Sequence, residues 1–308
     1  MKNRIFALGV VLSLSVATAA CAMMPDAMPH GGPTIKEKQL KPAFADVAYS
    51  DKSKTQKLDV YLPTGHTAPY PVVIYAHPGG FKFGDKTMAP YSIVHAILDK
   101  GYAFVSVDYR LSGESHYPAA VQDFFTATEF VQSHASEYHL NSGKIYYYGE
   151  SAGANIVALA GLAADNPVFN QEKLHPATFI KPAGVISLYP PVDFARIAEF
   201  TQAQGCSGGM HFPGLNFEEQ YLGGKLADNV DKIHAANPVT YVKAGAPAFF
   251  IENGSNDCNV GSEQSKLLVN ALTKAGVPVF YHEFPGAGHG GPEFETQENV
   301  KQLTDFLK

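Results

Sequence analysis

The sequence has no cluster of basic residues, no metal-ligand motif and only three cysteines in 308 residues. Its 23 Lys and Arg are outnumbered by 29 Asp and Glu, which gives a formal net charge of -6. Proteins that bind nucleic acids present a basic face to the phosphate backbone. The composition therefore excludes nucleic acid as a partner. Because no His, Cys, Asp and Glu residues have metal-ligand spacing, the sequence indicates neither a metal nor a cofactor.

Long apolar runs are also missing, except near the N-terminus. There, the basic residues Lys2 and Arg4 precede an apolar stretch from Ile5 to Val16, and small residues follow in the A-x-A spacing of a cleavage site. A membrane-spanning helix needs roughly 20 apolar residues, so this stretch is too short. We expect residues 1–22 to be an export signal and the protein to be periplasmic or extracellular, with no membrane span.

Two alternatives remain open at this end of the chain. An uncleaved signal would act as an N-terminal anchor. The segment TAAC, Thr18 to Cys21, resembles a bacterial lipoprotein box and would carry a lipid anchor on Cys21, although threonine stands where that box usually has leucine. Residues 23–42 are expected to form a leader before the folded domain.

Removal of Cys21 with the signal would leave Cys206 and Cys258 in an oxidising compartment, where disulfides persist. A bridge between these two residues and a pair of free thiols both fit the sequence. Spacing alone cannot show whether the two Cα atoms come close enough to be bridged. The Cys206–Cys258 disulfide is therefore a hypothesis at this point.

The body of the chain alternates between short apolar runs and longer helical patterns, as in a sheet that helices cover on both faces. Its length and its 45% hydrophobic content fit one large α/β domain. The short polar turn SDKSKTQ joins the first two strands, so we expect them to pair antiparallel. The others predict a mostly parallel sheet of eight strands flanked by helices. Strands are predicted at Phe44–Tyr49, Lys57–Leu62, Pro71–Ala76, Ala103–Tyr109, Lys144–Tyr148, Gly184–Tyr189, Ala248–Glu252 and Val277–Phe284, and helices at about Ser92–Lys100, Pro118–Ser133, Ala152–Ala163, Ser262–Ala275 and Glu295–Leu307.

One interval, about residues 193–243, breaks this alternation. It is rich in glycine and polar residues and contains no clear strand. A loop of this length inside a compact domain is usually functional. We expect a small insertion with its own helices, which acts as a lid over the carboxyl-terminal edge of the sheet within a domain that spans residues 43–308.

The pattern G-x-S-x-G occurs twice, as GESAG at Gly149–Gly153 and as GCSGG at Gly205–Gly209. A nucleophilic serine needs a tight turn between a strand and a helix, so that its hydroxyl is exposed and the first helical amide faces a developing oxyanion. The run IYYYG predicts the strand before Ser151 and ANIVALAG predicts the helix after it, whereas GCSGG has neither flank. We predict that Ser151 is the nucleophile and that GCSGG lies in a flexible loop.

A serine hydroxyl at neutral pH needs a base that takes its proton and an acid that orients this base. Of twelve histidines, His289 is the candidate base, because PGAGHGG follows the last strand and precedes the final helix. Asp257 is the candidate acid, since it follows the preceding strand and is expected at the same edge of the sheet. Glu252 falls within that strand and is the weaker alternative.

A glycine-rich segment, HPGGF, follows an earlier strand. Backbone amides of such a loop stabilise the oxyanion of a tetrahedral intermediate, and loss of one donor typically costs roughly a hundredfold or more in rate. Pro78 has no N–H and cannot donate. We expect the amides of Gly79, Gly80 and Ala152 to form the oxyanion hole; a plain Pro-Gly turn is the alternative.

Taken together, these motifs resemble the α/β-hydrolase superfamily, and within it the carboxylesterases of the hormone-sensitive-lipase and feruloyl-esterase-like (BD-FAE-like) group. The resemblance covers about Val47 to Leu307 and is far more specific than any single motif. Pro78 departs from the HGGG-type loop of the family. The motifs that carry the resemblance appear in family order: HPGGF, DYRL, Pro118 with Asp123 on the next helix, GESAG, YLGG, ENGSND and GAGHGG.

The resemblance implies the α/β-hydrolase fold, with Ser151 as nucleophile, Asp257 as acid and His289 as base, and with the oxyanion donors named above. It further implies that three polar residues tie loops together near the site and take no part in catalysis. These are Asp108, Arg110 and Asp123.

The sequence thus predicts a serine carboxylesterase that hydrolyses small or short-acyl carboxylic esters through an acyl-enzyme intermediate, without a cofactor. An amidase or peptidase of the same fold, such as a relative of arylformamidases or prolyl oligopeptidases, shares the triad and is the alternative. A non-catalytic binding protein of this fold is expected to have a damaged triad, whereas every element is present here. Acyl length, the alcohol and the oligomeric state stay open.

Overall fold

The computed structural model describes residues 31–169, 181–206 and 216–308. The predicted export signal, Cys21 and the greater part of GCSGG lie outside these residues. Within the described ranges, no helix has both the length and the apolar character needed to cross a membrane.

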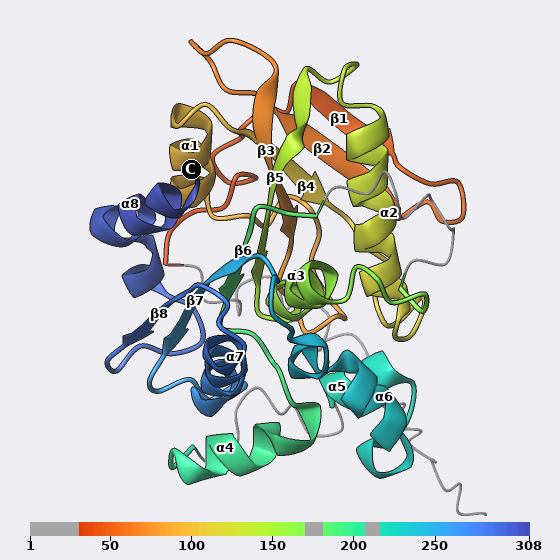
Figure 1. Ribbon diagram of the computed structural model, residues 1–308, viewed down its shortest axis with the longest axis vertical. Coiled ribbons are helices and arrows are strands. Elements are labelled where there is room, and N and C mark those ends of the chain that lie inside the picture. Colours follow the sequence, from red (N-terminus) through yellow and green to blue (C-terminus); the bar gives the residue numbers. More distant parts are fainter. Residues whose placement is uncertain (1–30, 170–180, 207–215) are drawn as a thin grey trace, which may run out of the picture.

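An eight-stranded sheet forms the centre of the molecule, as predicted (Figure 1). Its strand order is β1-β2-β4-β3-β5-β6-β7-β8. The pairs β1–β2 and β2–β4 are antiparallel, and all other neighbours are parallel. The strands are β1 (Phe44–Ala48), β2 (Lys57–Tyr61), β3 (Tyr70–Ala76), β4 (Ala103–Val107), β5 (Leu140–Glu150), β6 (Gly184–Leu188), β7 (Ala248–Gly254) and β8 (Val279–Phe284).

The central strand β5 is the clearest departure from the predicted boundaries, because it is 11 residues long and the sequence indicates only Lys144–Tyr148. Its first residue, Leu140, lies opposite Tyr70 of β3, and the polar residues 141–144 fall in a register shift before the regular ladder starts at Ile145. Asn, Gly and Glu are depleted in strands. Pairing with a central neighbour therefore overrides local preference at both ends of β5.

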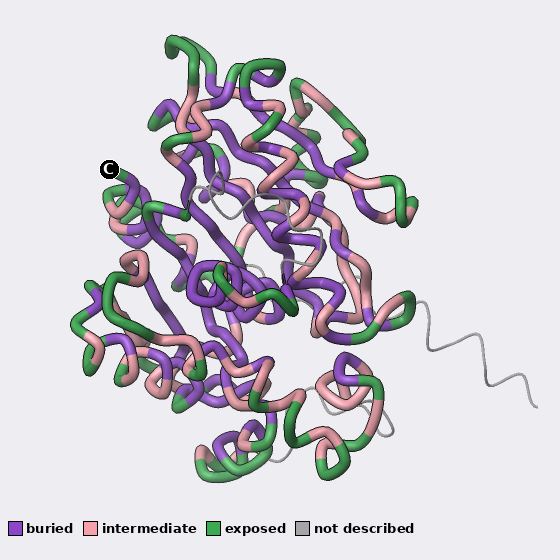
Figure 2. Tube along the Cα trace, turned by 45° about the vertical axis from the view of Figure 1, so that its right-hand side comes forward, coloured by how far each residue is buried: buried purple, intermediate pink, exposed green. Residues whose placement is uncertain are grey.

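Helices cover both faces of the sheet (Figure 1). One face carries α1 (Tyr91–Asp99) and α8 (Gln297–Phe306), and the other carries α2 (Ala119–Ser133), α3 (Ala152–Leu162) and α7 (Glu263–Lys274). Each face has its own apolar cluster, and Figure 2 shows the central strands as buried segments between the two layers. All five residues of β4 are buried, which explains why this strand is apolar almost throughout.

The final helix begins later than predicted. A separate 3-10 helix, η4 (Pro292–Glu295), comes first, and α8 starts at Gln297. Thr296 separates the two, because its hydroxyl oxygen accepts a hydrogen bond from the N–H of Asn299 and caps α8.

The insertion is helical in its described part, as expected. In Figure 1 its helices lie beyond one end of the sheet. Aromatic contacts attach them to the loop after β3: the Phe81 ring stacks on Tyr221 with 3.8 Å between centroids and contacts Phe194 at 5.8 Å. The insertion therefore lies over the carboxyl-terminal edge of the parallel strands. Its elements are η1 (Phe194–Arg196), α4 (Ile197–Ala203), α5 (Phe217–Leu222), η2 (Leu226–Asp228), α6 (Val230–Ala236) and η3 (Pro238–Tyr241).

A disulfide between Cys206 and Cys258 joins the insertion to the loop after β7, with the two Cα atoms 5.6 Å apart. The bridge that the sequence left as a hypothesis is therefore confirmed. Gln204 supports the same junction: its Nε2 donates to the carbonyl of Ser255 at 2.7 Å, and its Oε1 accepts from the N–H of Ser262 at 3.0 Å. The end of α4 is thus fixed to the loop that follows β7.

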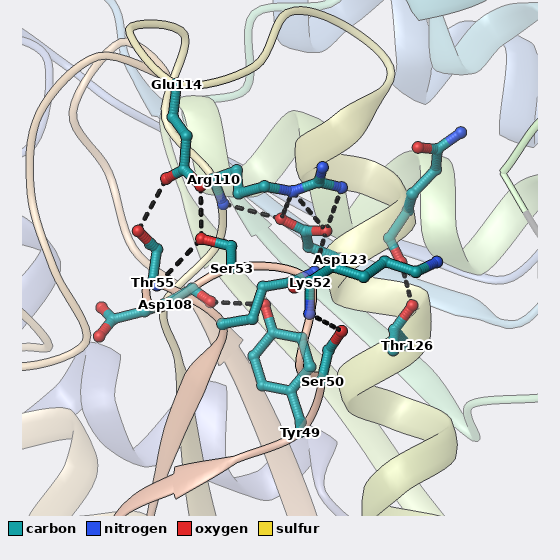
Figure 3. Close-up of polar contacts among 12 residues, drawn as sticks. Tyr49, Ser50, Lys52, Ser53, Thr55, Asp108, Arg110, Glu114, Asp123 and Thr126 are labelled. Carbon is teal, nitrogen blue, oxygen red and sulfur yellow. Dashed lines mark hydrogen bonds and ion pairs between the residues drawn. The ribbon is translucent and has the colours of Figure 1, made fainter.

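Arg110 and Asp123 tie the segment after β4 to α2 (Figure 3). Arg110 Nε and Nη2 donate to the Asp123 carboxylate at 2.9 and 2.7 Å, and the Arg110 N–H donates to it at 2.8 Å. Asp123 is 1% exposed and also accepts from Gln56 Nε2 at 2.7 Å. Asp108 instead accepts from the N–H of Lys86 at 2.6 Å. All three residues therefore make the structural bonds that the resemblance implies.

Candidate active site

Ser151 lies at the strand-to-helix turn between β5 and α3. Its φ of 52° is in the left-handed region, which non-glycine residues rarely adopt. The turn is so tight that a Cβ on Gly149 would lie 2.3 Å from the carbonyl oxygen of Gly153. A Cβ on Gly153 would lie 2.0 Å from the carbonyl oxygen of Ala76. Close backbone approach therefore requires both glycines of the motif.

The three predicted side chains converge at this turn. His289 Nε2 is 2.7 Å from Ser151 Oγ, and His289 Nδ1 is 2.7 Å from Asp257 Oδ2. The carboxylate only accepts, so Nδ1 carries the proton and Nε2 is left to accept from the serine hydroxyl. Ser151 follows β5, Asp257 follows β7 and His289 follows β8, which places all three at the carboxyl-terminal edge of the sheet.

Both oxygens of Asp257 have partners, and the residue is fully buried. Oδ2 faces His289, while Oδ1 accepts from the N–H groups of Asn259 at 2.8 Å and Val260 at 3.1 Å. Burial opposes ionisation, but the imidazole of His289 and these two amides outweigh it and hold the pKa of Asp257 below its ordinary value. The residue therefore supplies a negative charge beside His289 at neutral pH.

Glu252, the weaker alternative acid, is bonded elsewhere. Its Oε2 accepts from Asn299 Nδ2 of α8 at 3.0 Å, and its Oε1 has no hydrogen-bond partner in the described part of the chain. Burial raises the pKa of Glu252 to about 8, although the bond from Asn299 lowers it. A carboxyl group that is neutral at pH 7 cannot supply the charge that orients a histidine. The geometry thus supports the choice of Asp257.

The imidazole rests on an aromatic residue that sequence reasoning missed. Tyr189, directly after β6, meets the His289 ring edge-on with 4.8 Å between centroids. Its hydroxyl donates to Glu150 Oε1 at 2.9 Å, and the Tyr75 hydroxyl donates to Glu150 Oε2 at 2.6 Å. A charged residue at the end of an apolar strand was a usable signal for Glu150. No sequence signal pointed to Tyr189, because its position depends on a backbone φ of 44° directly after β6.

The loop after β3 brings Gly79 and Gly80 to the same edge as Ala152. Their φ angles of 128° and 58° favour glycine. Among the described residues, neither amide donates to a backbone carbonyl. Ala152 opens α3, and the first N–H groups of a helix have no intrahelical acceptor. These three amides are therefore suited to receive an oxyanion, and Pro78 adds no donor.

His77, directly before the glycine loop, stabilises this loop by a hydrogen bond and a ring contact. Its ring stacks on Tyr109 with 4.2 Å between centroids, and its Nδ1 donates to the carbonyl of Pro78 at 2.7 Å. The Tyr109 hydroxyl donates to the carbonyl of His77 at 2.8 Å. Burial lowers the pKa of His77 to about 4, so the ring is neutral at physiological pH. We assign it a structural role.

A polar cavity of about 620 Å³ adjoins the glycine loop. Phe217 of α5 packs against the same loop, because a Cβ on Gly80 would lie 2.9 Å from its ring. Seven of the nine residues that line the cavity are polar or charged, so the cavity is suited to bind hydroxyl groups. It is lined by Lys82, Ser112, His116, Asn216, Glu219, Gln220, Gly223, Gly224 and Lys225.

A serine on a strained strand-to-helix turn, with histidine and aspartate from later loops at the same edge of a mostly parallel sheet, defines the α/β-hydrolase fold class. The sequence model of the BD-FAE family matches residues 58–272. The chain belongs to this family, and the predicted recognition and fold class are confirmed.

Two curated relatives come from Mycobacterium tuberculosis. Esterase LipQ is 29% identical over 275 residues, which cover 85% of this chain and 61% of LipQ. Esterase LipC is 28% identical over 250 residues, which cover 79% of this chain and 59% of LipC. The chain thus spans about three fifths of the length of these relatives.

Solved structures share the fold. A truncated carbohydrate esterase from gut microbiota aligns with a TM-score of 0.74 at 25% identity, and the match covers 86% of this chain and 94% of that one. Esterase 2 of Thermogutta terrifontis with bound propionate aligns with a TM-score of 0.65 at 20% identity, over 90% and 93% of the two chains. The second likeness concerns the fold alone.

Proposed function

We propose that this protein is a carboxylic ester hydrolase of the serine type. The observation that carries the proposal is the unbroken chain of two 2.7 Å hydrogen bonds from Ser151 through His289 to the buried Asp257. Similarity to LipQ and LipC supports ester hydrolysis as the reaction.

The proposed reaction has two stages. In the first, Ser151 Oγ attacks the ester carbonyl while His289 Nε2 takes the hydroxyl proton, and the negative charge of Asp257 stabilises the imidazolium. The amides of Gly79, Gly80 and Ala152 receive the oxyanion. His289 then protonates the departing alcohol, which leaves an acyl group on Ser151. In the second stage, water attacks this acyl-enzyme with His289 as base, and the carboxylic acid is released.

A short-chain aryl ester tests the proposal directly. The wild-type protein should hydrolyse 4-nitrophenyl acetate or butyrate, and Ser151→Ala should reduce turnover to the level of the buffer with unchanged folding by circular dichroism. A wild-type protein that hydrolyses neither of these esters would overturn the assignment. Equal turnover by Ser151→Ala would instead overturn the role of the serine.

An amidase or peptidase remains the second candidate, because the same triad serves both reactions. Amides expel a poorer leaving group than esters, so discrimination requires a matched pair. An acetate ester and the corresponding anilide should differ in kcat/KM by orders of magnitude in favour of the ester. A preference for the anilide would reassign the protein as an amidase.

The polar cavity favours alcohols that carry hydroxyl groups as part of the substrate. It adjoins the oxyanion loop through Lys82, and polar or charged side chains make up most of its lining. The likeness to a carbohydrate esterase from gut microbiota agrees with an acylated sugar. A panel that compares acetylated and feruloylated sugars with methyl acetate and methyl ferulate measures this preference. Equal kcat/KM values for the sugar esters and the methyl esters would contradict it.

Export of the protein through residues 1–22 is also a proposal. The basic start, short apolar stretch and small residues support it. The intact mass of the mature protein distinguishes the outcomes: cleavage near residue 22 supports a secretory signal, a lipid mass on Cys21 supports an anchor, and the full-length mass contradicts processing.

A further inference from the structure

Residues 31–40, here called the N-terminal strap, pack against the body of the domain. They precede the family match at 58–272. The side chain of Ile35 is 1% exposed and belongs to the same apolar cluster as Ile93 of α1 and Phe294 of η4. The N–H of Ile35 donates to the carbonyl of Ala89 at 2.9 Å. The strap is therefore fixed to the domain by a buried side chain and by the backbone.

The beginning of the strap lies against the segment that follows the catalytic histidine. A Cβ on Gly31 would lie 2.2 Å from the Cα of Pro292 and 2.5 Å from the carbonyl carbon of Gly291, so the two backbones touch. The N–H of Gly32 donates to Glu295 Oε1 at 2.8 Å. In Figure 1 the first described residues, drawn in red, accordingly run beside the blue C-terminal part of the chain.

Glu295 also connects this junction to α1. Its second oxygen, Oε2, accepts from the Ser92 hydroxyl at 2.5 Å. One carboxylate thus joins three elements that are far apart in sequence: the strap, η4 and α1. Loss of this carboxylate would remove the hydrogen bond between the strap and η4 without removing any atom of the triad.

The segment from His289 to Glu295 also contacts Tyr189, the aromatic residue that packs against the His289 ring. Phe294 is 2% exposed and meets Tyr189 edge-on with 5.1 Å between centroids. Tyr189 in turn contacts the His289 ring at 4.8 Å. The segment from His289 to Glu295 is therefore enclosed between the strap on one side and Tyr189 on the other.

The backbone of this segment depends on glycine directly after His289. Gly290 and Gly291 have φ angles of 83° and 123°. Glycines give the backbone many accessible conformations. Contacts from outside the segment therefore help to set the position of His289.

We propose that the N-terminal strap is a positioning element for His289, and that Gly31 of the strap and Glu295 of η4 are the positioning residues. The proposal rests on the proposed function, since it concerns the distance from His289 Nε2 to Ser151 Oγ. A misplacement of a catalytic group by about 1 Å can cost on the order of a hundredfold in rate. The strap thus belongs to the framework that supports the active site.

The test compares three substitutions in the full-length protein with a short-chain aryl ester as substrate. Glu295→Ala removes the acceptor for Gly32, and kcat should fall by roughly tenfold to a hundredfold with KM within about twofold of wild type. Glu295→Gln keeps an oxygen acceptor and should restore most of kcat. Glu293→Ala, on the exposed side of the same 3-10 helix, is the matched control and should match wild type.

A second pair of variants probes the strap itself. Gly31→Ala forces the strap away from Pro292 and should lower kcat as Glu295→Ala does, whereas Lys36→Ala on the exposed side of the strap should not. The rate at which a fluorophosphonate labels Ser151 should fall in parallel with kcat, because labelling also needs His289 as base. Melting temperatures of all variants are measured alongside.

The outcomes separate the two proposals. A wild-type protein without esterase activity contradicts the proposed function. An active wild type whose Glu295→Ala and Gly31→Ala variants keep kcat and the labelling rate, with only a lower melting temperature, overturns the strap alone. A Glu295→Gln variant as slow as Glu295→Ala would also overturn it.

Discussion

Ser151 adopts a backbone conformation that costs its residue type about 1–3 kcal/mol, and the surrounding packing must maintain it. Two contacts do so at the level of single atoms. Gly149 lies against Gly153, and Gly153 lies against the end of β3 at Ala76. The proposed nucleophile Ser151 therefore keeps its conformation only as long as these backbones can approach each other.

The substitution Gly153→Ala tests this close approach. Its Cβ would meet backbone atoms, the carbonyl oxygens of Ala76 at 2.0 Å and His77 at 2.7 Å, which cannot yield as a side chain can. We expect a loss of stability of about 1–3 kcal/mol or more, together with loss of esterase activity. Gly143→Ala is the control, since its nearest neighbour is Asn141 Oδ1 at 3.3 Å. Equal urea unfolding curves and activities for both variants would contradict the account.

Asp257→Asn tests the charge beside the histidine while keeping the shape of the side chain. The amide oxygen can still accept from Asn259 and Val260, but the negative charge that stabilises the imidazolium is lost. We expect kcat to fall by about 10⁴-fold, with a smaller change in KM. Asp228→Asn, on the exposed 3-10 helix η2, serves as the control. Retention of more than a tenth of wild-type kcat would argue against Asp257 as the acid.

Glu252→Gln should change how stability depends on pH. The pKa of Glu252 rises from its ordinary 4.5 to about 8 in the folded protein because the residue is buried. Between these values the folded state binds more protons than the unfolded state. The contribution of Glu252 to stability is therefore complete below about pH 4.5 and declines until about pH 8, by up to about 1.4 kcal/mol per pH unit.

The Glu252→Gln variant has no carboxyl proton to lose at this position. Its stability should therefore fall less than that of wild type between pH 5 and pH 9. Urea unfolding at several pH values in this range measures the difference. Parallel stability curves for the two proteins would show that Glu252 ionises normally in the folded state. Activity at pH 7 should change little, because Glu252 makes no bond to His289 or Asp257.

The residues of the triad were predictable because each has a local signal: a tight turn between a strand and a helix for Ser151, and loops after consecutive strands for Asp257 and His289. Tyr189 and the strap residue Gly31 were not. Their roles arise from contacts between segments that are distant in sequence. No pattern of periodicity or spacing reports such contacts.

At the scale of elements, α4 and the loop after β7 form one unit. The Cys206–Cys258 bridge and the two bonds of Gln204 hold them together. Asp257 lies directly beside Cys258. The insertion therefore stabilises the acid loop in addition to covering the edge of the sheet.

Removal of the disulfide should cost more stability than activity. The bridge closes 52 residues, and loop-closure entropy for that length corresponds to about 4 kcal/mol, an amount that measured disulfides often fall below. Gln204 keeps its bonds in Cys206→Ser/Cys258→Ser, so the acid loop should stay docked at low temperature. Urea unfolding with and without reductant measures the stability. A double variant that unfolds like the oxidised wild type would contradict the estimate.

Within the described residues, every strand and every α-helix outside the insertion was anticipated from the alternation of apolar runs and helical patterns. Boundaries were less predictable. Strand β5 extends through LNSGK and through Glu150 because β3 and β6 offer partners, and such partners are invisible in a local window. The sequence predicted that the insertion contains helices but not where they lie. Their positions depend on contacts with Phe81 and Cys258, which are distant in sequence.

At the scale of the whole molecule, two apolar layers enclose a sheet, and the proposed catalytic residues lie at the carboxyl-terminal edge of this sheet. Loops after β3, β5, β7 and β8 each contribute part of the proposed machinery, and the strap and the insertion hold these loops from outside. The fold thus brings together residues separated by 138 positions, as with Ser151 and His289. The proposed catalysis therefore depends on the complete domain.

The central claim is that this convergence makes Ser151 a nucleophile. A fluorophosphonate probe followed by intact-mass and peptide mass spectrometry measures this most directly. One adduct per chain on Ser151, absent in Ser151→Ala and strongly slowed in His289→Ala, is the predicted result. A protein that hydrolyses short-chain esters while Ser151 stays unmodified, or that carries the adduct on another residue, would contradict the account.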